Sequence, residues 1–458
     1  MEVAAWVIFI ITALCIHWSC GQEPTETIQK LKNVEETVTS ATQAATPNEL
    51  DVATAINEFG FKLLVKMMKQ KKNENLVISP SGIAGVLAMA LLGTVGTTYS
   101  EVAETLGFSQ DIIVNRKNHE QFGALLQALN TNVSSKTLYA DAIFVDDNTQ
   151  LREIYRKYLN DVYGGDVLST DFQQAEQATL SINEWVRNHT EGKIETLFAE
   201  PLPPVTKVVL LSTLYFKGQW DQPFVPDATM KLPFNRTKDE VMADLMLNFG
   251  KFRYSFASRH GLHILAMPYN DSETTMYALM PIFPNELSIL DLMESLDYKK
   301  IDEIINGMSV KQCVVRFPKM DIRSTVKLQD ALQTMGIRSI FTPGLANFAL
   351  MVNSNMVVNK TEEEIITSID QGQIQTKGVT DLVNNLPNPG IHIDYIVHDV
   401  KMTINEYGTE AVAATGALLS RSAQRFYTDS PFYMFIRNEK TKLVTFSAVI
   451  FDPTVPVA

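Results

Sequence analysis

The segment NEYGTEAVAATGALLSRSAQRFYT, residues 405–428, is the most informative part of the sequence. From Gly408 to Gly416 it consists mostly of small residues, and the next proline is Pro431. Side chains alternate faces along a strand, and a central strand needs every backbone N–H, which proline lacks. The two faces would consist of Thr409, Ala411, Ala413 and Thr415, and of Glu410, Val412, Ala414 and Gly416. A strand with such small side chains could enter a sheet between two strands that are already in place.

Residues 418–422, LLSRS, follow at once and are typical of an exposed protease substrate. Arg421 offers a charged partner to the carboxylate in the specificity pocket of a trypsin-like protease, and Ser422 suits the position after the cut. An insertable segment joined to a cleavable one indicates a trap for a protease. Taken alone, the same residues are also compatible with an Ala/Thr/Gly-rich surface loop that has no special purpose.

The sequence on both sides of this segment resembles the serpin family of serine protease inhibitors. Upstream, NEYGTEA at 405–411 is similar to the serpin hinge. Downstream, the matching residues are Phe426, 429–432 (DSPF), 435–437 (FIR), Lys440, Thr441 and Phe446. Earlier matches in the family's order are Ser79 and Pro80; Trp185, Thr190, Gly192, Lys193 and Ile194; 214–220 (LYFKGQW), Pro223 and Phe224; Pro318 and Lys319; Leu328, Leu332, 335–337 (MGI), Phe341 and Phe348; and Val397 and His398. Together they cover nearly all of 52–453.

This resemblance implies an α+β fold, the serpin fold, with a large central mixed β-sheet, further sheets, surrounding helices and an exposed reactive-centre loop at about 406–428. One serpin domain over 52–458 is expected, because apolar strand-like runs and amphipathic runs alternate without a dividing linker. An apolar fraction of 45% is ample for a sizeable core. Between about 352 and 393 the chain is longer than the family requires, and we expect a surface elaboration there.

Two elements near the start of this domain follow from their residue patterns. The apolar residues Ile56, Phe59, Leu63 and Met67 recur at spacings of three and four, which predicts an amphipathic helix over 52–70. Next, NLVISPS at 75–81 predicts a short strand that ends at a proline and leads into a helix.

By resemblance, the hinge consists of Glu406, Gly408, Thr409, Glu410, Ala411, Val412, Ala413, Ala414 and Thr415. The positions that serpins use beneath the sheet (the shutter) and at its top (the breach) would be Ser79, Ser212, Trp220 and His398. Two positions depart from the family. Ser212 stands where most serpins carry an asparagine, and Gly82 stands where a second serine is usual. Both changes should weaken the polar contacts beneath the sheet.

In inhibitory serpins the loop is the substrate. The catalytic serine of the protease attacks the carbonyl of the specificity residue and forms an acyl-enzyme. The freed hinge then inserts as a new central strand, and the linked protease is dragged away with its active site distorted. Spacing counted from Gly408 places the specificity residue at Ser422, whereas charge favours cleavage between Arg421 and Ser422, and Arg425 is a third candidate. We expect a trypsin-like serine protease as the partner, and a monomeric inhibitor rather than an enzyme.

The main alternative is a non-inhibitory serpin that acts as a carrier or binding protein, in which Arg421 is merely solvated. Such relatives often carry bulky, charged or proline residues in the hinge, and the row that begins at Thr409 carries none. No HExxH, GxSxG or GxGxxG motif occurs in the sequence. His260 and His263 lack a third metal ligand, so we expect no metal and no cofactor, and we expect His398 to be structural rather than catalytic.

The net charge of −13 and the pI of about 5.1 argue against binding to nucleic acid or to anionic membranes. One basic cluster stands out: Lys62, Lys66, Lys69, Lys71 and Lys72. A solvated helix face is the favoured interpretation of this cluster, and a polyanion site is the alternative.

Residues 1–21 resemble a secretory signal peptide. An apolar run fills 3–16, which is short for a membrane span, and small residues precede Gln22. The alternative is an uncleaved anchor, because Glu2 replaces the usual basic start. We therefore expect a secreted, extracellular protein.

Cleavage of that peptide would leave 22–51 as a flexible N-terminal extension and Cys313 as the one remaining cysteine, so no intramolecular disulfide would form. Flanking valines favour a buried, unreactive Cys313. Five N-x-S/T sites fit a secreted glycoprotein. They are Asn132, Asn188, Asn235, Asn270 and Asn359.

Overall fold

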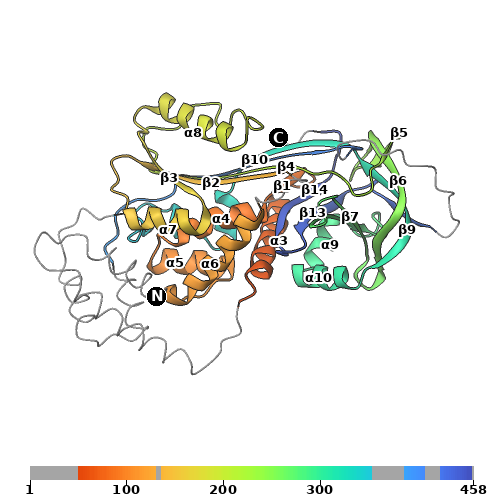
Figure 1. Ribbon diagram of the computed structural model, residues 1–458, viewed down its shortest axis with the longest axis horizontal. Coiled ribbons are helices and arrows are strands. Elements are labelled where there is room, and N and C mark those ends of the chain that lie inside the picture. The colour runs from red at the N-terminus through yellow and green to blue at the C-terminus, as the bar shows by residue number, and fades with distance from the viewer. Residues whose placement is uncertain (1–49, 130–135, 353–385, 408–422, 456–458) are drawn as a thin grey trace, which may run out of the picture.

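The computed structural model describes residues 50–129, 136–352, 386–407 and 423–455. These residues form a five-stranded sheet, a nine-stranded sheet and surrounding helices, which confirms the expected α+β class (Figure 1). The helices are α3 (Val52–Gln70), α4 (Pro80–Leu91), α5 (Gly96–Leu106), α6 (Ile112–Leu129), α7 (Glu153–Tyr163), α8 (Ala175–His189), α9 (Ile289–Ser295), α10 (Tyr298–Asn306) and α11 (Gln329–Thr334), with 3₁₀ turns η2 (Ser258–His260) and η3 (Ser339–Phe341).

The five-stranded sheet has the order β10-β11-β4-β2-β3. Its strands are β2 (Lys136–Asp146), β3 (Asp166–Thr170), β4 (Val208–Lys217), β10 (Met320–Lys327) and β11 (Tyr395–Ile404). In β4, VVLLSTLYF is buried at every residue, as expected of a strand covered on both faces. Figure 1 shows α8 above this sheet and α4 below it.

The nine-stranded sheet has the order β1-β14-β13-β8-β7-β6-β9-β12, with β5 paired to β6. Its strands are β1 (Leu76–Ile78), β5 (Val225–Asn235), β6 (Glu240–Ala257), β7 (Leu262–Pro268), β8 (Thr274–Pro281), β9 (Ser309–Pro318), β12 (Gln424–Tyr427), β13 (Phe432–Asn438) and β14 (Val444–Ile450). Every residue of β13 and β14 is buried. One apolar cluster joins the two sheets, with Leu214 and Val400 from the five-stranded sheet and Met434 and Phe446 from the nine-stranded one.

Helices α3 and α4 confirm the two elements predicted from residue patterns. Asp51 caps α3 by accepting a hydrogen bond from the Thr54 amide, and the predicted apolar stripe is buried. Strand β1 leads into α4, where Ser79 is the N-cap and Pro80 the first helical residue. All residues of α4 are buried, so this helix lies at the centre of the fold.

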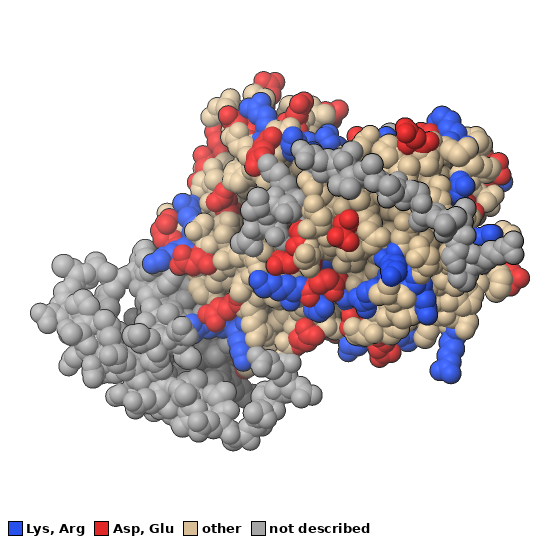
Figure 2. All heavy atoms as spheres, turned by 45° about the vertical axis from the view of Figure 1, so that its right-hand side comes forward, with Lys and Arg blue, Asp and Glu red and all other residues tan. Residues whose placement is uncertain are grey.

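The predicted basic cluster lies on α3 and just beyond its end, with all five lysines exposed. Lys69 forms an ion pair with Glu294, and Lys62 lies 4.0 Å from Glu58. Figure 2 shows acidic and basic side chains interspersed over much of the described part of the face that it presents. Exposed lysines with surface ion pairs are what a solvated helix face would give.

Several expectations concern residues outside the described ranges. They include the signal peptide, nearly all of the N-terminal extension, and 353–385 of the expected insertion. Leu386, Ile391 and Ile393, at the end of that insertion, are buried, so its last residues belong to the packed body. Among the described helices none is long and apolar enough to cross a bilayer. Cys313 is buried and free, as expected.

We expect Gly60→Ala to destabilise the protein, because α3 packs directly against the start of α4 there. A Cβ on Gly60 would lie 2.2 Å from Pro80 Cβ, so the helices would have to move apart. The cost should be about 1–3 kcal/mol, more than the gain in helix propensity of about 0.5–1 kcal/mol. In Gly307→Ala the nearest atoms lie at 3.6 Å, so this control should unfold at the wild-type temperature. Equal thermal midpoints for the two variants would contradict this account of the α3–α4 contact.

Candidate functional site

The central feature of the five-stranded sheet is the seam between β4 and β11. The two strands run parallel and are paired directly, from Tyr395 opposite Val209 to Met402 opposite Phe216. Strand β11 ends at Ile404 and leads into the segment that the sequence singles out. The seam is therefore adjacent in sequence to the predicted hinge.

The predicted shutter residues meet beneath this seam. His398 is fully buried, and its Nε2 accepts the backbone N–H of Ser79 at 2.7 Å. Ser79 Oγ in turn accepts the amide of Gly82 at 3.1 Å, which completes the cap of α4. Burial lowers the pKa of His398 to about 3, so its ring is neutral at ordinary pH and fits a structural role.

Ser212 lies opposite His398 in the seam, and its Oγ has no hydrogen-bond partner among the described residues. A Cβ on Gly82 would lie 2.6 Å from this oxygen, so the glycine allows α4 to approach the sheet closely. The two departures from the serpin pattern, Ser212 and Gly82, thus face each other across the helix–sheet contact.

One further buried polar residue was not predicted. Asp141 on β2 is 5% exposed and pairs directly with Ser212 on β4. The hydroxyl of Tyr139 donates to its Oδ2. Burial raises the pKa of Asp141 to about 8, against the smaller opposing effects of the Tyr139 and Ser212 hydroxyls. The signal in the sequence was an aspartate inside the strand-like run YADAIFV.

The predicted breach residue Trp220 holds the end of β11. Its Nε1 donates to the carbonyl oxygen of Asn405 at 2.9 Å, and its ring stacks on Tyr269 with centroids 4.5 Å apart. The amide of Phe224 donates to the carbonyl of Glu406 at 3.1 Å. Two hydrogen bonds therefore fix the backbone at Asn405 and Glu406, where the predicted hinge begins.

The Glu406 side chain adds an ion pair at the same place. Its carboxylate is 6% exposed and accepts from Lys319 Nζ at 3.0 Å and from Thr229 Oγ1 at 2.8 Å. Burial alone would raise the pKa of Glu406, but the hydrogen bonds and the lysine charge hold it below its ordinary value. The next residue, Tyr407, is 47% exposed, so the chain leaves the protein body between these two residues.

The far end of the loop segment is anchored in the other sheet. Strand β12 runs parallel to β9, and Phe426 is fully buried against His263, with ring centroids 4.8 Å apart. The amide and hydroxyl of Thr428 both donate to the carbonyl of Arg316. His263 thus packs against β12, and burial lowers its pKa to about 4. The described residues contain no cluster that could hold a metal ion.

The predicted reactive bond and most of the hinge lie outside the described residues. These are Gly408, Thr409, Glu410, Ala411, Val412, Ala413, Ala414, Thr415, Arg421 and Ser422. Of the predicted glycosylation sites, Asn132 and Asn359 also lie outside, whereas Asn188, Asn235 and Asn270 are exposed.

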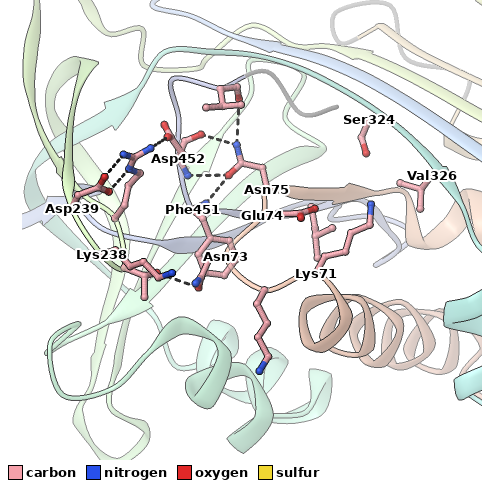
Figure 3. A pocket seen from close by; sticks show the side chains of 15 residues that line it. Lys71, Asn73, Glu74, Asn75, Lys238, Asp239, Ser324, Val326, Phe451 and Asp452 are labelled. Carbon is pink, nitrogen blue, oxygen red and sulfur yellow. Dashed lines mark hydrogen bonds and ion pairs between the residues drawn. The ribbon is translucent and has the colours of Figure 1, made fainter.

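A separate pocket of about 570 Å³ lies near the end of α3 and the β5–β6 turn (Figure 3). Arg236 forms ion pairs with Asp239 and Asp452, each at 2.6 Å. The Asn75 side-chain oxygen accepts the amides of Phe451 and Asp452. These contacts fasten the C-terminal segment to the β5–β6 turn and to the connection between α3 and β1. Lys71 and Lys72 of the basic cluster line the pocket, whereas none of the predicted hinge, shutter, breach or glycosylation residues does.

Replacing Lys319 with methionine should destabilise the protein by about 1–3 kcal/mol, because the nearly buried Glu406 carboxylate would lose its cation. Lys231→Met is the matched control, since Lys231 and its partner Asp244 are 68% and 48% exposed. That control should cost about 0.5 kcal/mol or less. Thermal unfolding of both variants measures the difference. A Lys319→Met protein as stable as the control would show that the ion pair does not hold the end of β11.

Comparison with known proteins extends these observations. The family model "Serpin (serine protease inhibitor)" matches residues 54–453. The chain is 28% identical over 416 residues to serine protease inhibitor 28Dc of Drosophila melanogaster, covering 82% of this chain and 75% of the relative.

Two solved structures share the fold. Native protease nexin-1 with heparin has a TM-score of 0.72 at 24% identity, over 88% of this chain and 99% of that one. Thyroxine-binding globulin in complex with thyroxine has a TM-score of 0.74 at 21% identity, over 89% of this chain and 100% of that one. Since the family match covers most of the sequence and the two-sheet architecture agrees with it, the chain belongs to the serpin family.

Proposed function

We propose that this protein is a secreted inhibitor of a trypsin-like serine protease, which it traps as a covalent acyl complex. Membership of the serpin family supports protease inhibition in general. The observation that supports trapping by loop insertion is the direct parallel pairing of β4 and β11, with β11 leading straight into the loop segment. The trypsin-like target rests on Arg421 in the sequence.

The topology of this seam favours insertion of a strand that is antiparallel to both of its neighbours. A segment that reverses direction after Ile404 runs antiparallel to β11. Because β4 is parallel to β11, the same segment is antiparallel to β4 as well. Insertion would replace one parallel ladder with two antiparallel ones, which are slightly more stable per residue. The small residues of the hinge would add little bulk between α4 and α8.

The chemistry of the trap belongs to the protease. Its serine oxygen bonds to the carbonyl carbon of Arg421, the amide bond to Ser422 breaks, and Ser422 takes up a proton as the new amino terminus. Insertion then separates Arg421, with the attached protease, from the fragment that β12 retains. Arg425 is a poorer candidate for cleavage, because it lies within β12 and is paired with Val314 of β9.

The remaining features belong to the same proposal. Residues 1–21 are a signal peptide and 22–51 an N-terminal extension, followed by the serpin domain at 52–458 with an insertion at about 352–393. The inhibitor is a monomeric glycoprotein that requires neither metal nor cofactor. The exposed positions of Asn188, Asn235 and Asn270 support glycan attachment there.

A carrier function is the second candidate. Thyroxine-binding globulin, whose structure is a complex with thyroxine, has a similar fold. A carrier does not need to insert its loop, so the response to loop cleavage separates the two candidates.

Mixing the protein with trypsin should give an SDS-stable complex and a C-terminal fragment that begins at Ser422. Arg421→Ala should slow complex formation about 100-fold or more, because the specificity pocket of trypsin would keep an unpaired buried carboxylate. Arg425→Ala should leave the rate unchanged. A fragment that begins at Ala423 would instead identify Ser422 as the specificity residue. Clean cleavage without complex would refute inhibition of trypsin-like proteases.

Cleavage of the loop by a non-target protease should raise the thermal midpoint by about 6 °C or more, if the new strand adds about 5 kcal/mol. Thr409→Arg should abolish this rise and convert the inhibitor into a substrate, since a buried unpaired charge is costly. Thr409→Ser is the matched control and should behave as wild type. A wild-type protein whose midpoint does not change on cleavage would support the carrier function instead.

A further inference from the structure

Three residues form a polar row across the five-stranded sheet beneath the seam. Asp141 on β2 pairs with Ser212 on β4, and Ser212 pairs with His398 on β11. All three point toward α4. A Cβ on Gly85 would lie 2.5 Å from Asp141 Oδ2, one on Gly82 would lie 2.6 Å from Ser212 Oγ, and His398 binds the cap of the helix. The row therefore lies between the sheet and the helix.

Three atoms in this row, His398 Nδ1 among them, are buried without a hydrogen-bond partner among the described residues. Asp141 Oδ2 accepts the Tyr139 hydroxyl, whereas Asp141 Oδ1 has no hydrogen-bond partner among the described residues. Ser212 Oγ, on the residue directly opposite, also has none. A buried polar atom without a hydrogen bond is unfavourable. Either the Ser212 hydroxyl could donate to an ionised Asp141 or a protonated Asp141 could donate to Ser212 Oγ, and burial of the carboxyl without a cation beside it favours the protonated form.

No cation among the described residues offsets a charge on Asp141. On its own strand the nearest titratable group is the Tyr139 hydroxyl. On α4 it faces Gly85, and on β4 it faces Ser212, neither of which ionises. Near Gly85 the neighbouring side chain is Leu126 of α6. Tyr163 of α7 lies close to Tyr139, and His398 lies on β11, on the other side of β4 from Asp141. His119 of α6 is a buried histidine that binds Tyr163.

We propose that the Asp141 carboxyl is protonated at neutral pH and links β2 to β4 through Tyr139 and Ser212, and that its ionisation loosens this contact beside the insertion seam. The proton makes Asp141 a positioning residue for β4. This strand forms one wall of the β4–β11 seam, so its hold on β2 bears on how readily the sheet opens.

The expected pH dependence follows from linkage. The pKa of Asp141 is about 8 in the folded protein, and an unfolded aspartate titrates near about 4. Because the pKa is higher in the folded protein, the neutral carboxyl contributes its full share to the free energy of unfolding below a pH of about 4. The stabilisation is lost progressively up to a pH of about 8, at about tenfold in the unfolding equilibrium constant per pH unit. An asparagine has no proton to lose and resembles the neutral acid in shape.

The test compares wild type with Asp141→Asn by thermal unfolding between pH 5 and 9. The midpoint of the variant should rise relative to wild type as pH increases toward about 8, and then stay at a constant difference. Asp227→Asn is the matched control, because Asp227 is exposed, and its difference from wild type should not change with pH. An Asp141→Asn protein that follows wild type at every pH would overturn the proposal.

A second measurement keeps the proposal testable if that variant fails to fold. In wild-type protein with ¹³C-labelled aspartate carboxyls, one resonance should titrate near pH 8, and Tyr139→Phe should shift it. Aspartate resonances that all titrate below about pH 6 would also overturn the proposal.

The link to inhibition rests on the proposed function and needs its own readout. Wild-type protein incubated before mixing with protease should lose inhibitory capacity faster at pH 8.5 than at pH 6.5, whereas Asp141→Asn should lose it at one rate. A protein that forms no complex at any pH refutes the inhibitory function but leaves the unfolding and carboxyl measurements valid. An active wild type that loses capacity equally at both pH values would overturn the effect on insertion.

Discussion

The parallel ladder between β4 and β11 is the contact on which the rest of this structure depends. Both strands are interior strands of the five-stranded sheet, and β4 is buried at all but its last residue. Opening this ladder exposes backbone groups in the centre of the protein, which is costly unless another strand fills the gap at once. The geometry thus favours either a closed seam or a seam filled by a new strand. A partly open sheet has no compensating contacts.

The two ends of the loop segment explain why cleavage should be the event that decides between these states. Glu406 is fixed two residues after the end of β11 of the five-stranded sheet, by Lys319 and by Thr229 of β5, whereas Phe426 is fully buried on β12 of the nine-stranded one. Deep insertion of an uncut loop would pull β12 away from β9 and expose Phe426, at a cost of about 1.5–3 kcal/mol for that side chain alone. The ladder bonds of β12 would be lost as well. Cleavage between the two anchors removes this cost, because the distal fragment can stay paired with β9.

The fold and part of the site could be predicted because their signals are local in the sequence. The apolar stripe of α3 and the strand–proline–helix sequence at Ser79 predict elements directly, and the motif around Trp220 resembles a known family. The partners of these residues are not local. Glu406 pairs with Lys319, 87 positions away, and its hydroxyl donor Thr229 is 177 positions away. Such pairings depend on strand order and register, which residue patterns in one sequence do not specify.

Asp141 escaped prediction for a related reason, and it changes how the departures at Ser212 and Gly82 should be understood. Considered singly, Ser212 replaces an amide with a shorter hydroxyl and Gly82 removes a hydroxyl, so each departure should weaken the contacts under the sheet. In the structure the short serine faces the aspartate across one ladder pair, and glycines at two positions of α4 leave space for both side chains. The three residues therefore form one arrangement, in which a protonated Asp141 carboxyl would donate a hydrogen bond to Ser212. The strength of the contact between β2 and β4 would then depend on a proton, and so on pH. In most serpins an amide side chain stands at the position of Ser212 instead.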